Sequence, residues 1–157
     1  MADNKQVKEA VSTFKALCKA LDKQNWKYEA NEEKLKVQYT VSGDSLKMSF
    51  LILIDPERRL VRVVSYLPFT VKKNAGAVAR AIAQVNYTMV AGAFEYDYTD
   101  GSVCFQMCAS YTGALLGEGA FRYLVNVSAN TVDEYHDELL MLEQGEITIE
   151  QFMKKHA

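Results

Sequence analysis

The chain has 157 residues, a length that suits one domain with its own core, since domains commonly run to about 100–200 residues. Two prolines and eight glycines exclude a collagen-like or low-complexity chain, and the 49% of hydrophobic residues is an ordinary globular value. The net charge of −2 weighs against a basic face that would hold nucleic acid, so we expect no nucleic-acid partner. No apolar run approaches the roughly 20 residues of a membrane span, so we expect no membrane partner.

The charge is unevenly distributed along the chain. Residues 1–80 carry 15 Lys and Arg against 9 Asp and Glu, whereas residues 81–157 carry 3 against 11. This asymmetry has two interpretations. It either guides self-association or the binding of a basic partner, or it reflects one basic and one acidic end helix that are simply solvated.

The three cysteines predict no disulfide. Cys104 and Cys108 are four residues apart on one expected strand, so their Cα atoms lie about 13 Å apart, whereas a disulfide needs about 4.4–6.8 Å. Cys18 lies on the apolar stripe of an expected helix. The segment Met1–Lys8 is polar and charged, unlike a signal peptide. We therefore expect a cytoplasmic protein with reduced cysteines.

The first half of the chain predicts a helix followed by strands. Apolar residues recur at steps of four and three over Asn4–Lys23, which is typical of an amphipathic helix. Trp26 and Tyr28 then open a strand-like region. Apolar and polar residues alternate over three segments, which are expected to be strands: residues 35–41, 46–54 and 60–66. Short links between them favour an antiparallel meander, and Leu67-Pro68-Phe69 is expected to end the third strand.

The second half predicts two long helices with a hairpin between them. The helices are expected over residues 73–91 and 120–142, the first with a left-handed stop at Gly92 and the second ending at Gly145. Strands are expected over residues 94–98 and 103–111. Asp100-Gly101 between them is the strongest hairpin signal in the chain.

These elements follow the order α-β-β-β-α-β-β-α, with a short helical tail at about residues 146–157. We therefore expect an α+β fold in which a five-stranded antiparallel sheet is packed by helices. No linker or composition shift divides the sequence, so we expect a single domain over residues 1–157.

Few residues in the sequence have the spacing of a catalytic or metal site. His136 and His156 have no Cys or His at metal-ligand spacing, and His136 is expected to be a solvated helix residue. Glu95 and Asp97 are spaced like an acid/base pair, but carboxylates that alternate with Phe94 and Tyr96 also suit a solvent-facing strand. We therefore predict no catalytic, metal or cofactor site, and a protein that is not an enzyme.

Apolar residues also occur on the second face of the expected sheet. They are a candidate partner or dimer surface: Leu51, Leu53, Leu60, Val64 and Tyr66. The alternative is that the C-terminal helix covers this face.

Several sequence segments resemble the YbjN family, whose fold looks like that of type III secretion chaperones such as the Tir chaperone. The resemblance spans roughly residues 10–145. The segments that carry it are Trp26-Lys27-Tyr28, Leu53-Ile54-Asp55, Val63–Pro68, Val85-Asn86-Tyr87, Gly92–Asp97 and Asp100-Gly101. The sequence departs from the family in the glycine loop from Thr112 and in Gln106, where a basic residue is expected.

The resemblance implies a homodimer that holds extended segments of a polypeptide partner against apolar patches, and it supplies no catalytic site. Some family members are described as sensory transduction regulators. In this reading Asn86, Gly92, Asp100 and Gly101 are structural, with Asn86 bonded to the backbone and Gly92 at positive φ.

We therefore expect a non-enzymatic protein-binding module, chaperone-like or regulatory. The alternative is a small-ligand-binding protein or an unrecognised enzyme with a pocket between the sheet and the helices. The residues expected near such a pocket are Tyr39, Tyr66, Tyr96 and Tyr111.

Overall fold

A computed structural model describes residues 2–156, so Met1 and Ala157 lie outside the described residues. The helices are α1 (Asn4–Lys23), α2 (Ala75–Thr88), α3 (Glu118–Gln144) and α4 (Ile149–Lys155). The strands are β1 (Tyr28–Asn31), β2 (Lys36–Ser42), β3 (Lys47–Asp55), β4 (Leu60–Thr70), β5 (Ala93–Tyr96) and β6 (Ser102–Ser110). The α+β fold with an antiparallel sheet and helices is confirmed.

The sheet has six strands, not the expected five, in the order β1-β2-β3-β4-β6-β5, and every neighbouring pair is antiparallel. The additional strand is β1. It pairs with β2 from Tyr28 opposite Tyr39 to Asn31 opposite Lys36. Its last three residues are exposed, so it lacks the apolar alternation by which a half-buried strand is recognised.

The segment Leu67-Pro68-Phe69 does not end the third predicted strand, because β4 continues to Thr70 with an irregular register after Tyr66. The pairing of β4 with β3 covers Leu60 to Val64, and its pairing with β6 skips residues 67–69, so Pro68 lies in an irregular stretch of the strand without a registered partner residue. Proline is tolerated where a strand needs no bond on one side.

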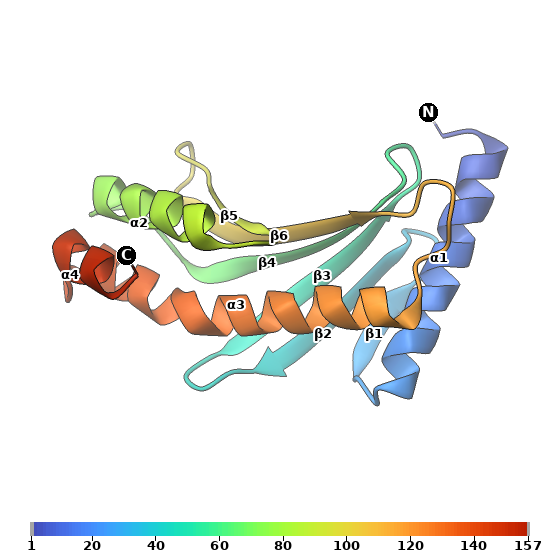
Figure 1. Ribbon diagram of the computed structural model, residues 1–157, viewed down its shortest axis with the longest axis horizontal. Helices are drawn as coiled ribbons and strands as arrows, with labels where there is room; N and C mark the ends of the chain where they lie inside the picture. Colours follow the sequence, from blue (N-terminus) through green and yellow to red (C-terminus); the bar gives the residue numbers. More distant parts are fainter. Residues whose placement is uncertain (1, 157) are drawn as a thin grey trace.

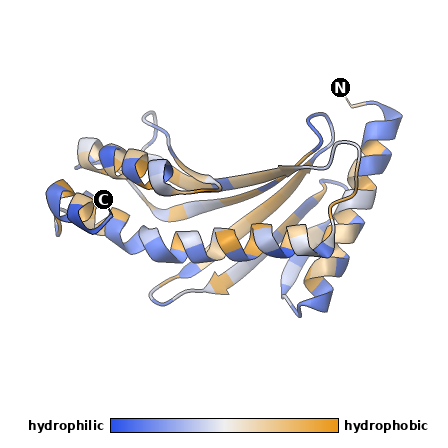
Figure 2. Cartoon of the chain, in the orientation of Figure 1, coloured by the Kyte–Doolittle hydropathy of each residue, from blue (hydrophilic) through white to orange (hydrophobic). Residues whose placement is uncertain are grey.

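The helices all pack on one face of the sheet. Helix α3 runs across the strands, with α1 at one end and with α2 and α4 together at the other (Figure 1). The strands are mostly hydrophobic, whereas the helices alternate between hydrophobic and hydrophilic residues (Figure 2), as expected where one side of each helix packs on a core. One row of this inner face lies across four neighbouring strands and is almost fully buried: Val37, Ile52, Val63 and Met107.

Helix α3 also holds the β2–β3 hairpin. Asp133 accepts the backbone N–H of Asp44 at 3.1 Å, and His136 lies 3.1 Å from the Ser45 hydroxyl. His136 is only 1% exposed, so the expectation of a solvated histidine is wrong. Its position on α3 is one turn after buried Val132, which places it on the inner side of the helix rather than on the acidic outer side.

A buried carboxylate joins α3 to the start of α2. Glu143 is 6% exposed and accepts backbone N–H groups of Lys72, Lys73 and Asn74 at 2.8–3.0 Å. Burial opposes its charge, but the N–H bonds outweigh this effect and lower the pKa of Glu143. The acidic second half of α3 is therefore not simply solvated.

A second polar link joins α2 to the edge strand β5. The Asn86 side chain accepts the N–H of Phe94 at 2.8 Å and donates to its carbonyl oxygen at 2.9 Å, as a neighbouring strand would.

Helix α2 ends at Thr88, earlier than expected. Gly92 has φ +77°, and a Cβ there would lie 2.3 Å from the Phe105 ring, so only glycine fits this approach.

We predict that Glu143→Gln lowers the free energy of unfolding by about 1–3 kcal/mol at pH 7, because an amide replaces a carboxylate that receives three N–H groups. Since folding lowers the Glu143 pKa, the carboxylate's contribution is present above the ordinary glutamate pKa of about 4.3 and is lost as the pH falls through the folded-state value. Urea unfolding from pH 3 to 7 should therefore show a difference that grows with pH. The matched control is Glu146→Gln, at an exposed site. An equal loss in both variants would contradict the prediction.

We predict that Asn86→Asp destabilises the protein by about 1–3 kcal/mol at neutral pH, because a carboxylate cannot donate to the Phe94 carbonyl oxygen. Urea unfolding measures the effect. Asn126→Asp, at an exposed position of α3, is the control and should stay within about 0.5 kcal/mol of wild type. Equal behaviour of the two variants would show that the link carries no stability.

Candidate functional site

The outer face of the sheet has no described helix packed on it. The five residues of the predicted partner surface all lie on this face, by the alternation and register of β3 and β4. Leu51, Leu53 and Leu60 are half-buried, Val64 is 6% exposed and Tyr66 is 65% exposed. Helices α3 and α4 lie on the opposite face, so the C-terminal helices do not cover these residues. We call this set the open-face patch.

A chain of polar contacts begins within the open-face patch, because Arg62 lies between Leu60 and Val64 on β4 and opposite Leu53. Arg62 of β4 donates to the Gln106 side chain of β6, and Gln106 donates to Glu95 of β5 at 3.2 Å. The departure from the family at Gln106 is thus accompanied by a basic residue on the neighbouring strand. The apolar surface of the patch is therefore interrupted by Arg62, whose side chain is bonded to Gln106.

Cys104, on this face, is a weak nucleophile. Burial, followed by the Glu95 carboxylate, raises the pKa of Cys104 to about 11, which keeps its thiol protonated at neutral pH. Cys108 is exposed, and Cys18, Cys104 and Cys108 are all free.

Glu95 and Asp97 do not form a shared acid/base site. Glu95 receives Gln106 and, at 3.8 Å, the Cys104 thiol. Asp97 accepts the backbone N–H and the hydroxyl of Thr99 at 2.8 and 2.6 Å, and these bonds lower its pKa. Each carboxylate therefore has separate local partners.

The β5–β6 hairpin is held by its turn residues. Asp100 accepts the N–H of Ser102 at 2.8 Å. Gly101 has φ +77°, and a Cβ there would lie 2.3 Å from the Val71 carbonyl oxygen, so this position requires glycine. The strand before the turn ends at Tyr96, two residues earlier than expected.

The four tyrosines of the alternative pocket do not converge. Tyr39 is buried against Phe50 with ring centroids 5.0 Å apart, and burial raises its pKa. Tyr111 is buried and donates to the Asp55 carbonyl oxygen at 2.9 Å. Tyr66 and Tyr96 line a different hollow near the β5–β6 hairpin.

One arrangement that no sequence pattern predicted resembles a nucleophile with its base. Ser45 lies 3.1 Å from Nε2 of His136, but its hydroxyl is 2.6 Å from Oδ2 of Asp137 and donates there. Nδ1 of His136 lies 2.8 Å from the Val132 carbonyl oxygen, which can only accept, so this nitrogen carries a proton. Because the Ser45 hydroxyl donates to the Asp137 carboxylate, it is not held as a nucleophile by His136. Ser45, His136 and Asp137 instead attach the β2–β3 hairpin to α3. Ser45 and His136 are 91 positions apart in the sequence, so no short motif indicates this contact.

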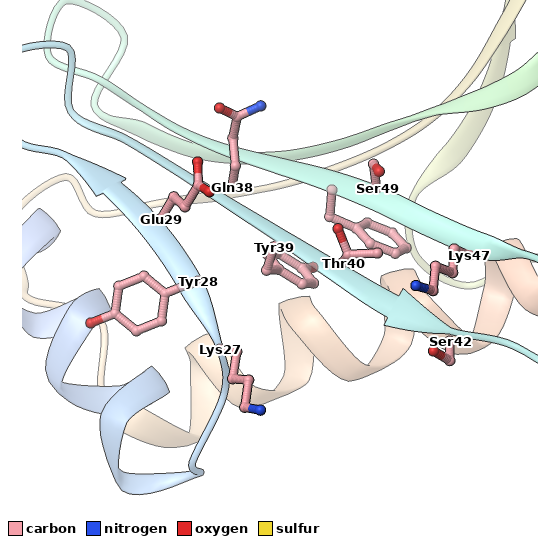
Figure 3. A pocket seen from close by; sticks show the side chains of 10 residues that line it. Lys27, Tyr28, Glu29, Gln38, Tyr39, Thr40, Ser42, Lys47 and Ser49 are labelled. Carbon is pink, nitrogen blue, oxygen red and sulfur yellow. The ribbon is translucent and has the colours of Figure 1, made fainter.

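Two hollows lie towards opposite edges of the sheet. One, of about 730 Å³, is bordered by residues from β1, β2 and β3 and their flanks, among them Lys27, Gln38 and Lys47. Figure 3 shows Gln38 and Tyr39 pointing to opposite sides of β2. The other, of about 490 Å³, lies at the β5–β6 hairpin beside Tyr66.

The described part of the chain holds no group of three or more His, Cys, Asp or Glu side chains placed to bind a metal ion. Within residues 2–156, no helix combines the length and the apolar character needed to cross a membrane.

Solved structures share this fold. YbjN from E. coli superposes with a TM-score of 0.59 at 10% identity, covering 80% of this chain and 89% of that one. A chain of the ExsC–ExsE complex gives a TM-score of 0.57 at 13% identity, covering 82% and 93%. A chain of the HopA1–SchA chaperone–effector complex gives 0.56 at 9% identity, covering 87% and 99%. At these identities the likeness establishes the fold alone.

Comparison with curated proteins gives no match. A family model does match residues 13–141, most of the chain, and that family is described as "putative bacterial sensory transduction regulator". The expected family relationship is confirmed, and the chain belongs to the YbjN family.

Proposed function

We propose that this protein is a non-enzymatic module, chaperone-like or regulatory, that binds another polypeptide through the outer face of its sheet. The observation that carries the proposal is the open-face patch, which lies on a face without a described helix. Apolar side chains gathered on a surface outside the core are typical of an interaction site. The three leucines are half-buried by their neighbours, so a partner has to cover only a shallow surface.

The structural neighbours support a polypeptide as the partner. Two of them are chains of complexes between proteins, the ExsC–ExsE complex and the HopA1–SchA chaperone–effector complex. In the protein described here, β1 and β5 are the edge strands of the sheet. An extended partner segment could pair with one of these edges, or an amphipathic helix could place its apolar side on the open-face patch.

The polar groups support a role without catalysis. The Ser45 hydroxyl is engaged by Asp137, and the Cys104 thiol has a raised pKa. The three free thiols suit a reducing compartment, and we place the protein in the bacterial cytoplasm.

We also infer a homodimer. The family resemblance implies it, and the unequal charges of residues 1–80 and 81–157 provide an electrostatic attraction between two copies. This attraction weakens as salt screens it.

We predict that Leu51→Lys/Leu53→Glu reduces capture of a partner from bacterial lysate at least tenfold. The double variant keeps the net charge and places two charges on the proposed contact surface. The measurement is quantitative mass spectrometry of polypeptides that copurify with the full-length protein. Leu115→Glu/Tyr123→Lys is the matched control, because both residues are exposed and lie outside the open-face patch. Circular dichroism and urea unfolding establish that both variants fold.

Enrichment of the same polypeptide by wild type and control, with loss in the Leu51/Leu53 variant, would support the proposed function. It would be overturned if wild type enriched no polypeptide, or if the Leu51/Leu53 variant captured as much as wild type.

We predict a mass of about 35 kDa in sedimentation equilibrium at micromolar concentration and low salt, twice the 17.7 kDa of one chain. The dimer should weaken as NaCl rises towards about 1 M, where charges are screened beyond roughly 3 Å. A 17.7 kDa species under all conditions would exclude the dimer.

A further inference from the structure

We propose that His136 carries a positive charge in the folded protein, and that this charge makes the attachment of the β2–β3 hairpin to α3 sensitive to pH. The inference goes beyond the proposed function, because it concerns the protein's own hairpin and needs no partner. The group consists of Ser45 in the hairpin and of His136 and Asp137 on α3. We call these three residues the hairpin anchor.

The tip of the hairpin depends on α3 for its attachment. The pairing of β3 with β4 stops at Leu51 opposite Val64, and the two strands diverge beyond this point (Figure 1). Among the described residues, the hydrogen bonds that residues 43–46 make outside the hairpin all go to α3. The N–H of Asp44 donates to Asp133, and the other bonds belong to the hairpin anchor.

The contacts of the hairpin anchor need more hydrogens than a neutral histidine supplies. Nδ1 of His136 carries one, because it lies 2.8 Å from the Val132 carbonyl oxygen, which only accepts. The single hydrogen of the Ser45 hydroxyl lies towards Oδ2 of Asp137, 2.6 Å away, a distance typical of a hydroxyl that donates to a carboxylate. Nε2 of His136 then faces two acceptors, the Ser45 oxygen at 3.1 Å and Oδ1 of Asp137 at 3.2 Å. A hydrogen on Nε2 completes these contacts, and a ring with hydrogens on both nitrogens is an imidazolium.

The surroundings of His136 favour a positive charge on the ring. The His136 side chain is 1% exposed, so water screens its contact with Asp137 less than it screens an ion pair on the surface. Lys47 lines the same hollow of about 70 Å³ as His136, but lysine is outnumbered there by carboxylates. The titratable and charged residues around His136, from α3, the hairpin and β4, are Asp133, Asp137, Asp44, Lys47 and Tyr66.

The charge makes the attachment of the hairpin tip weaker as the pH rises. While the ring of His136 is protonated, Nε2 donates to the other two anchor residues. Once the ring loses this hydrogen, Nε2 presents a lone pair to oxygen atoms that also carry lone pairs, and the attraction is lost. The contribution to stability is therefore present at lower pH and absent at higher pH. The freed tip includes Ser42 and Lys47, which border the hollow of about 730 Å³ at β1–β3.

The charge is tested by ¹H–¹⁵N NMR of the imidazole nitrogens in the full-length protein at pH 7. The two nitrogens of an imidazolium have similar ¹⁵N shifts, whereas those of a neutral ring differ widely. The chain has two histidines, and a His156→Gln variant identifies the signals of His136. We expect the imidazolium pattern for His136, and a neutral ring at pH 7 would overturn the inference.

Two variants test which anchor residue holds the charge. In Asp137→Asn, the new amide can donate to Nε2, so we expect a neutral His136. In Ser45→Ala, Asp137 remains to accept the hydrogen of Nε2, so we expect the imidazolium to persist. Glu134→Gln is the matched control, because it removes one negative charge from an exposed position of α3 and should leave His136 charged. A neutral ring in Ser45→Ala, or the same ring state in Asp137→Asn and Glu134→Gln, would contradict the assignment.

Hydrogen exchange of the Asp44 amide measures the attachment of the tip, because this N–H donates to Asp133 next to the hairpin anchor. Its protection factor is compared with that of Ile52 in the core, and circular dichroism establishes that each variant folds. Between pH 6 and 8.5 we expect the ratio to fall about fivefold in wild type and Glu134→Gln, as a hydrogen bond from a charged donor is lost. In Asp137→Asn it should be low at every pH. A constant ratio in wild type would reject the pH response.

Discussion

A sheet has two faces, and the described helices of this protein pack on one of them. This one-sided packing is the constraint on which the other features depend. It places the core between α3 and the strands, and it leaves the leucines of β3 beside solvent. Residues at alternate positions of one strand therefore differ in role: Ile52 belongs to the core, whereas Leu51 and Leu53 belong to the open-face patch.

The architecture was predictable where periodicity is strong. The alternation in β3 and the apolar stripe of α1 identified these elements because each buries one face, and burial leaves a period in the sequence. Strand β1 left no such signal, because its last three residues are exposed at an edge. The continuation of β4 through Pro68 was missed for a related reason: tolerance of proline there depends on which neighbours the strand has, and these are set by the fold.

The candidate site was predictable only in part. The sequence placed Leu51 and Leu53 on a second face, but whether a helix covered that face depended on where α3 and α4 pack. The contacts of Ser45 with His136, and of Glu143 with residues 72–74, join segments about 70–90 residues apart. Several acidic residues that the sequence suggests are solvated therefore accept hydrogen bonds from backbone N–H groups. Composition cannot distinguish these roles, because both use the same residue types.

The attachments of α3 have a consequence for the proposed binding of another chain. This helix is bonded to α1 through Glu118 and Lys23, to the β2–β3 hairpin through Asp133, and to α4 through Glu138 and Lys155. Contacts at several points along α3 restrict its movement. The sheet on which α3 packs therefore changes conformation little when a partner binds. The conformational entropy lost on association then falls mainly on the incoming segment. Stiffening that segment in advance, for example by cyclisation, should tighten the complex more than any stiffening of this protein.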